Sequence, residues 1–110
     1  MTHVFSGLPV RDYEVASAWY TQLLGRTADM VPHDTEGVWR LTDDASLYVV
    51  QDRLRAGNGL LTVALDDLDA HEQRLRAAGI TFTEPAAGDA PRRLVVTDPD
   101  GNTLTFFEEP

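Results

Sequence analysis

Cysteine is absent from this chain of 110 residues, so the chain has no disulfide, no thiolate metal ligand and no thiol nucleophile. A chain without cysteine suits a reducing compartment, and we expect a cytoplasmic protein. The amino terminus lacks the charged region and apolar run of a signal peptide, and no apolar run approaches membrane-spanning length. Serine elbow motifs and glycine-rich phosphate loops are also missing, which leaves nucleophilic and nucleotide chemistry without support.

Basic residues are scarce: the chain has nine basic and eighteen acidic residues, which gives a formal net charge of −9. A field of that sign repels phosphate backbones, so nucleic acid is not an expected partner. The acidity either keeps the protein soluble or attracts a cationic ligand. A hydrophobic content of 43% over this length suits one compact domain, residues 1–110.

The stretch 95–108 is typical of two strands joined by a turn. Apolar and β-branched residues enter, Asp98-Pro99-Asp100-Gly101-Asn102 reverses the chain, and an alternating run leaves. Residues 41–51 have the same order of elements with a shorter turn. The chain is therefore predicted to contain a duplicated unit.

Each copy predicts the order β-α-β-β-β. In the first, a strand over 3–10 precedes a helix over 13–24 that Asp12 caps and Gly25 ends. In the second, acidic residues begin a helix that runs to Ala78 and stops at Gly79. The other predicted strands are 27–31, 38–41, 47–51, 60–65, 80–83, 93–97 and 103–107, with loops at 32–36 and 84–91. This gives a first module at 1–53, a linker at 54–59 and a second module at 60–110.

Three motifs occur in a recognisable order and spacing. They are Val10-Arg11-Asp12 with Trp19-Tyr20 and Leu23-Leu24-Gly25, then Leu65-Asp66-Asp67-Leu68 with Leu75 and Ala77-Ala78-Gly79, then Asp98-Pro99-Asp100-Gly101-Asn102. In these features the chain resembles the vicinal oxygen chelate superfamily, which includes glyoxalase I, extradiol dioxygenases, fosfomycin-resistance enzymes and bleomycin-resistance proteins. The resemblance implies an α+β fold in which two tandem β-α-β-β-β modules form an incomplete eight-stranded, cup-like barrel, usually completed by a second subunit.

Metal-dependent members of that superfamily carry one ligand on the first and last strand of each module. The matching positions here are Phe5, Tyr48, Leu60 and Thr105. Phenylalanine and leucine have no donor atom, and neutral tyrosine and threonine oxygens are poor substitutes for imidazole or carboxylate. We therefore expect no catalytic metal and no other cofactor.

Strand alternation predicts which side chains face the cup. Large aromatic residues mixed with small and hydroxylated ones describe a ligand pocket better than a closed core. The alternative is that Phe5, Tyr48 and Phe107 fill the cup and nothing binds. Trp39 borders the cup, with its direction left open by the pattern. The predicted ligand-binding residues are Phe5, Trp39, Tyr48, Leu60, Thr62, Thr105 and Phe107.

Other candidates have structural interpretations. His71 lies on the helix stripe between Leu68 and Leu75, which favours a hydrogen-bonded histidine at the core edge over a catalytic base. Arg92 and Arg93 either reach an anionic group or pair with surface acids.

The residues favour a binding protein over an enzyme. Our leading hypothesis is a metal-independent protein similar to the bleomycin-resistance type, which sequesters an aromatic or cationic small molecule in a cup at a homodimer interface. Pro9, near the end of the first strand, fits a group in which that strand is exchanged between subunits. The alternatives are a metal-dependent glyoxalase-like lyase or extradiol dioxygenase with displaced ligands, and a dimeric regulatory module with a filled cup.

Overall fold

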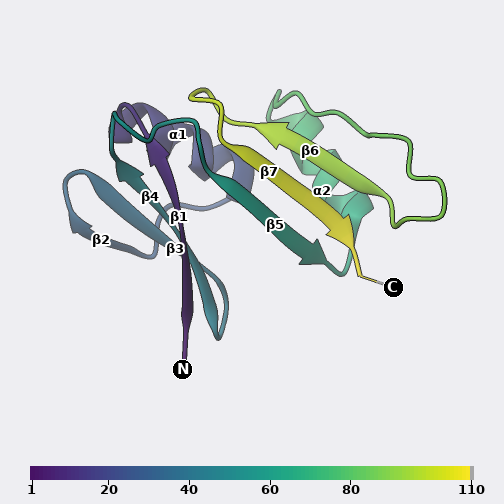
Figure 1. The fold of residues 1–110 in the computed structure, drawn as a ribbon, viewed down its shortest axis with the longest axis horizontal. Helices are drawn as coiled ribbons and strands as arrows, with labels where there is room; N and C mark the ends of the chain where they lie inside the picture. The colour runs from purple at the N-terminus through teal and green to yellow at the C-terminus, as the bar shows by residue number, and fades with distance from the viewer. Residues whose placement is uncertain (110) are drawn as a thin grey trace.

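The fold is α+β, and a computed structural model describes residues 1–109 of it. The final residue of the expected domain, Pro110, lies outside the described residues. The first sheet has the order β1-β4-β3-β2 and the second β5-β7-β6. The elements are β1 (Val4–Val10), α1 (Tyr13–Leu24), β2 (Met30–His33), β3 (Glu36–Thr42), β4 (Ala45–Gln51), β5 (Leu60–Leu65), α2 (Leu68–Ala77), β6 (Arg93–Thr97) and β7 (Thr103–Glu108) (Figure 1).

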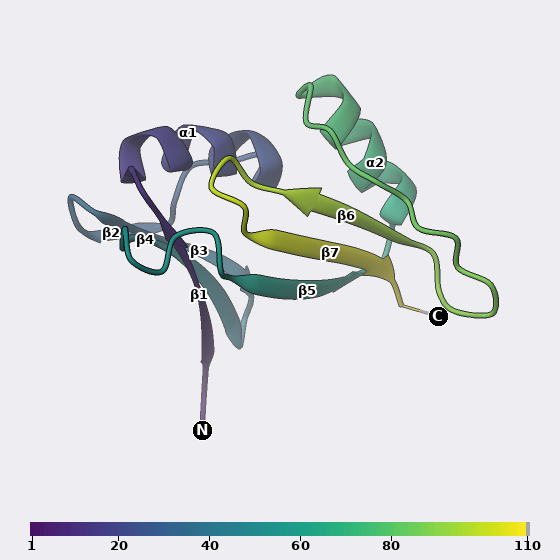
Figure 2. The same ribbon diagram turned by 45° about the horizontal axis from the view of Figure 1, so that its top comes forward.

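Each sheet is covered on one face by one helix, and the two helices lie on the same side of the molecule (Figure 2). In each half the strand that precedes the helix runs parallel to the strand beside it: β1 pairs with β4, and β5 pairs with β7. No other segment of residues 1–109 covers the opposite faces of the two sheets (Figure 2). We call this uncovered side the open face. Among residues 1–109, no helix is long and apolar enough to cross a membrane.

The hydrophobic core lies between the sheets and the helices. Alternate strand residues turn toward the helices, and Leu47, Val49 and Leu104 are fully buried there while Phe106 is 2% exposed. Leu61, Val63 and Leu65 are partly buried and pack against the same core. Alternation along the strands therefore places these residues on the helix side of the sheets.

Capping residues fix both helix starts. The Asp12 carboxylate accepts a hydrogen bond from the backbone N–H of Val15 at 3.3 Å, and the Asp67 carboxylate accepts one from the N–H of Ala70 at 3.0 Å. Gly25 ends α1 with a φ of 77°, a conformation that glycine adopts without steric cost. The predicted bounds of α1, residues 13–24, are confirmed. They could be predicted because the capping residues lie next to the helix ends in the sequence.

A second capping bond comes from the neighbouring strand, and it recurs in both halves. The side-chain oxygen of Gln51, the last residue of β4, accepts from the N–H of Tyr13 at 3.0 Å. The carboxylate of Glu108, the last residue of β7, accepts from the N–H of Leu68 at 3.0 Å. The repeat thus extends beyond the hydrophobic pattern to the bond that ties each helix to its sheet.

Two predicted elements differ from the structure. The strand predicted at 27–31 is β2, Met30–His33, so much of the loop predicted at 32–36 is strand and a tight turn joins it to β3. The strand predicted at 80–83 is reduced to a single bridge between Thr83 and Val95. After that bridge the chain leaves β6, and Arg92, at the end of the following loop, forms ion pairs with Asp69 and Glu72 of α2.

The turn between β6 and β7 contains a buried carboxylate. Asp98 is 3% exposed, and its Oδ1 accepts from the backbone N–H groups of Asp100, Gly101 and Asn102, each at 2.9 Å. Its Oδ2 accepts from the Tyr20 hydroxyl at 2.7 Å and from the Asn102 amide at 2.7 Å. Burial, reinforced by the Asp98 charge, raises the pKa of Tyr20 above its ordinary value of 10.0.

Asn102 carries the same network into the first half of the chain. Its side chain is fully buried; the Nδ2 group donates to the carbonyl of Pro9 at 2.7 Å, and Oδ1 accepts from the N–H of Gly59 at 2.7 Å. Pro9 belongs to β1, and Gly59 immediately precedes β5. The turn therefore holds the end of β1 against the start of β5, where the two halves meet.

Tyr20→Phe is expected to lower the free energy of unfolding by about 1–2 kcal/mol, because Asp98 loses a buried donor. The unfolded chain releases the Tyr20 proton near pH 10.0 and the folded protein retains it. The wild-type advantage is therefore complete below that pH and shrinks as the pH rises above it. Urea unfolding of both proteins at about pH 8 and about pH 11 measures the difference. Tyr13→Phe, which removes a hydroxyl outside this network, is the control, and a difference between wild type and Tyr20→Phe that stays constant with pH contradicts the prediction.

Candidate functional site

The open face gathers all the predicted ligand-binding residues except Trp39. On the first sheet, the β1–β4 ladder pairs Gly7 with Tyr48, and Phe5 lies two residues before Gly7 on the same face. On the second sheet, Thr62 pairs with Thr105 and Ala64 with Phe107, while Leu60 lies two residues before Thr62. Alternation and register thus bring residues from four strands to one side of the molecule.

Trp39 does not belong to this surface. It pairs with Leu47 across β3 and β4, which turns it toward the helices, and it is 0% exposed. Its indole Nε1 donates to the backbone carbonyl of Arg26 at 2.9 Å. The prediction of Trp39 as a ligand-binding residue at the open face is therefore wrong, because the ring is part of the core.

The open face is apolar and accessible. Phe5 is 55% exposed and Leu60 is 81% exposed, while Tyr48, Thr105 and Phe107 are half-buried. Large apolar side chains grouped on an uncovered sheet face are typical of a surface that contacts a ligand or another chain. At the start of β1, the His3 ring lies 4.6 Å from the Phe5 ring and its Nε2 is 2.8 Å from the Ser46 hydroxyl.

The position of the Tyr48 ring depends on a glycine. A β-carbon built on Gly7 would lie 2.4 Å from Cζ of Tyr48 and 2.6 Å from its hydroxyl oxygen. Real atoms do not approach this closely, so the phenol lies across β1 only because position 7 has no side chain. This pair shapes the first-sheet part of the open face.

The four positions that match the superfamily's metal ligands do not fit a divalent ion. Phe5 and Leu60 offer no donor atom, and Tyr48 and Thr105 offer only neutral hydroxyls. Across residues 1–109, no three His, Asp or Glu side chains come together in an arrangement that could hold a metal.

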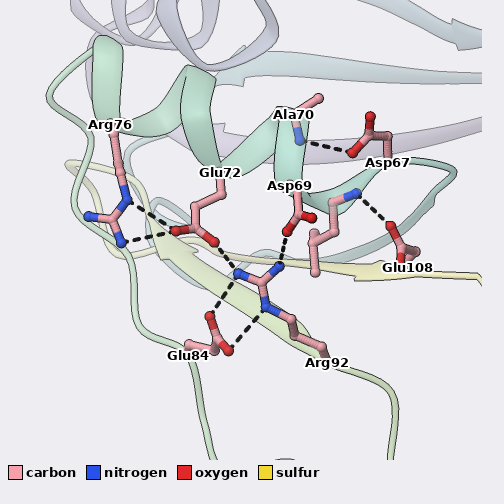
Figure 3. Close-up of polar contacts among 9 residues, drawn as sticks. Asp67, Asp69, Ala70, Glu72, Arg76, Glu84, Arg92 and Glu108 are labelled. Carbon is pink, nitrogen blue, oxygen red and sulfur yellow. Dashed lines mark hydrogen bonds and ion pairs between the residues drawn. The ribbon is translucent and has the colours of Figure 1, made fainter.

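Arg92 lies in an ion-pair network on the outside of the second half (Figure 3). Its guanidinium contacts Asp69 at 2.7 Å, Glu84 at 3.0 Å and also Glu72. Hydrogen bonds from Arg76 and Arg92 hold the pKa of Glu72 below its usual value, and Glu84 and Glu72 raise the pKa of Arg92. Of the two roles that the sequence left open for Arg92, pairing with surface acids is the one the structure shows.

Arg93 occupies a different position from its neighbour. It pairs with Phe107 across β6 and β7, which places it on the same face of the second sheet as Phe107 and Thr105. A cation therefore borders the hydroxyl and aromatic groups of the open face.

His71 differs from the hydrogen-bonded histidine expected at the core edge. It is 4% exposed, its ring lies 4.2 Å from the Phe106 ring, and its Nε2 has no hydrogen-bond partner among the described residues. Burial lowers the pKa of His71 to about 4, and the positive charge of Arg74 contributes to the shift. The histidine is thus neutral at pH 7 and incompletely bonded.

Comparison with known proteins decides the family. The protein-family model described as Glyoxalase/Bleomycin resistance protein/Dioxygenase superfamily matches residues 1–106. The chain belongs to this superfamily. A solved structure of a glyoxalase/bleomycin resistance protein from Catenulispora acidiphila is 33% identical over 100% of both chains, with a TM-score of 0.94. The superfamily resemblance stated from the sequence is confirmed.

Two further solved structures have the same fold. TnmS3, an antibiotic binding protein from Streptomyces sp. CB03234, is 25% identical over 100% of this chain and 98% of its own, with a TM-score of 0.78. A bleomycin-binding protein complexed with bleomycin is 20% identical over 100% of this chain and 98% of its own, with a TM-score of 0.76. Among curated proteins, a search finds no match.

Gly7→Ala is expected to displace the Tyr48 ring and lower the free energy of unfolding by about 1–3 kcal/mol, the usual cost of overpacking. The φ of Gly7 is not positive, so the backbone accepts alanine and the cost comes from the clash. Chemical denaturation measures the loss. In a Tyr48→Ala background the same substitution should cost little, and an equal cost in both backgrounds contradicts the prediction.

Arg92→Gln is expected to release the loop at 84–92 from α2, because the amide cannot satisfy three carboxylates. Backbone amides of that loop should exchange with deuterium several-fold faster, as the bonds that hold them open more often. Hydrogen-exchange mass spectrometry gives the rates. The matched control is Arg93→Gln, which removes a cation outside the network. Equal exchange in the two variants contradicts the role of Arg92.

Proposed function

We propose that the protein binds a small molecule without a metal and sequesters it unchanged, in the manner of bleomycin-resistance proteins. The open face carries this proposal, because it offers exposed apolar side chains, two half-buried aromatic rings and threonine hydroxyls. The four positions that match the superfamily's metal ligands carry neither imidazole nor carboxylate. The likeness to TnmS3, an antibiotic binding protein, supports the same function.

The chemistry of the open face favours a planar aromatic ligand. Tyr48 and Phe107 provide flat apolar surfaces, and Thr62 and Thr105 provide hydroxyls that donate or accept hydrogen bonds. The formal net charge of −9 attracts a cationic molecule from solution. An aromatic or cationic compound is accordingly the proposed ligand class.

A second copy of the chain is the proposed cover for this face. We take residues 1–110 as one domain, made of modules 1–53 and 60–110 joined by the linker 54–59. Phe5, at 55% exposure, and Leu60, at 81%, leave apolar surface on the open face that a homodimer interface would bury. β1 pairs with β4 over Val4–Val10 within the chain, and an exchanged strand would make the same ladder between subunits. We place the homodimer in the cytoplasm on the cysteine-free composition of the chain.

Binding is tested with a panel of cationic glycopeptides and planar aromatic compounds, using thermal unfolding and calorimetric titration. At least one compound should raise the melting temperature in a saturable way. Leu60→Asp should lower the affinity for that compound by about tenfold or more, since a charge replaces an apolar contact. Val15→Ser, at a 60% exposed position on α1, is the matched control and should change nothing. If no compound of the panel raises the melting temperature, the proposed function is contradicted.

The enzyme alternatives are tested on protein purified without chelator. Elemental analysis is expected to find no stoichiometric divalent ion, and assays with methylglyoxal plus glutathione and with catechol are expected to show no turnover. One tightly bound ion per subunit, or turnover of either substrate, would contradict the proposed binding function and favour a lyase or dioxygenase. A stable dimer that binds no compound would instead favour a regulatory module with a filled cup.

A further inference from the structure

The two neighbouring arginines Arg92 and Arg93 differ in their partners. All nine arginines of the chain lie in its described part, and these two are partly buried while the other seven are exposed. Arg92 forms ion pairs with three carboxylates (Figure 3). Among the described residues, Arg93 forms no ion pair with any carboxylate. Arg93 is therefore a partly buried positive charge without a negative partner.

A charge in such a place normally has compensation. Partial burial removes part of the hydration of a guanidinium, and proteins usually offset that loss with an opposite charge. The chain has eighteen acidic residues, so acids are not scarce. Glu108, at the end of the adjacent strand, turns to the helix side instead, where its carboxylate accepts from the N–H of Leu68 at 3.0 Å. The positive charge of Arg93 is thus left available on the open face.

The strand register places an aromatic ring and hydroxyl groups beside Arg93. β7 lies between β6 and β5 (Figure 1), and one row across the three strands contains Arg93, Phe107 and Ala64. In an antiparallel pair such as β6 and β7, the β-carbons of opposite residues are about 5 Å apart. The next row contains Thr105 and Thr62. A ring stacked on Phe107 would therefore have a cation on one side, a small residue on the other, and hydroxyls nearby.

We propose that Arg93 selects the ligand of the open face, and that this ligand is a planar aromatic acid whose carboxylate binds Arg93 while its ring stacks on Phe107. The inference rests on the binding function proposed above and narrows its ligand class. A guanidinium is planar and donates two parallel hydrogen bonds to a carboxylate. One cation balances one negative charge, so a carboxylate fits better than a phosphate dianion, which would keep a surplus charge.

The acidity of the whole chain acts over a longer distance than this contact. The formal net charge of −9 attracts cations and repels anions during their approach. At physiological ionic strength such a field decays over about 8 Å, whereas a hydrogen-bonded ion pair acts at contact. The net charge is therefore expected to slow the association of an anion, while the bond to Arg93 determines how tightly the anion is held.

The test compares three naphthalene derivatives of similar shape: anionic 2-naphthoate, neutral 2-naphthamide and cationic 2-naphthylmethylamine. In calorimetric titrations of the full chain at neutral pH, 2-naphthoate should bind about tenfold more tightly than 2-naphthamide, and the amine no more tightly than the amide. Arg93→Gln should make the affinities for 2-naphthoate and 2-naphthamide equal. Arg93→Lys should retain part of the preference, because lysine keeps the charge but not the two parallel donors.

Matched variants separate the contact from the general effect of charge. Arg74→Gln removes the same charge from an exposed position on α2, which lies across the second sheet from the open face (Figure 2), and should leave the preference unchanged. Phe107→Ala should lower the affinities for 2-naphthoate and 2-naphthamide alike. If Arg93→Gln does not fold, the ¹⁵N resonances of the Arg93 guanidinium in the wild-type protein decide, since they should shift further with 2-naphthoate than with 2-naphthamide.

The outcomes separate this inference from the proposed function. The inference is overturned, and the binding function retained, by equal wild-type affinities for 2-naphthoate and 2-naphthamide, or by tighter binding of the amine. The same holds for a preference that survives Arg93→Gln or is lost in Arg74→Gln. If none of the three derivatives binds, the inference is overturned as well, and the compound panel described above decides separately on the binding function.

Discussion

The buried carboxylate of Asp98 is the interaction on which the arrangement of the two halves depends. A charge in the protein interior is tolerated when its lone pairs are satisfied, and Asp98 accepts three backbone and two side-chain hydrogen bonds. Through Tyr20 it holds α1, and through Asn102 it holds the end of β1 and the residue before β5. Both helices lie on one side of the molecule, and the open face is left on the other (Figure 2).

Much of the fold could be predicted because its signals are local or repeated. Asp12 and Gly25 define α1 by chemistry within a few residues of its ends, and alternation along each strand separates the helix side from the open face. Asp98 and Asn102 were predicted to belong to a turn, and they do. Their longer role was not visible, because the Tyr20 hydroxyl is 78 residues from Asp98 in the sequence and only the folded chain brings them together.

The features that the sequence did not predict depend on how separate elements meet. Trp39 faces the core because of the register of β3 against β4, where the ladder shifts between Arg40 and Thr42. The contact between Gly7 and Tyr48 joins two strands that are distant in sequence. A pocket lined by Leu24 of α1, Leu61 of β5 and His71 of α2 exists because these elements of the two halves converge there. The periodicity or motif of a single element cannot predict contacts or pockets that form between elements.

One consequence follows from where the tryptophans lie. The chain has two, Trp19 on α1 and Trp39 on β3, and both belong to the first half of the duplicated structure. Trp19 packs edge-on against Tyr20 at 4.8 Å, and Trp39 lies 6.1 Å from the same ring. Intrinsic fluorescence therefore reports on one copy of the repeat, whereas far-ultraviolet circular dichroism reports on both. Whether those two signals change together during unfolding tells whether the two halves unfold as a single cooperative unit.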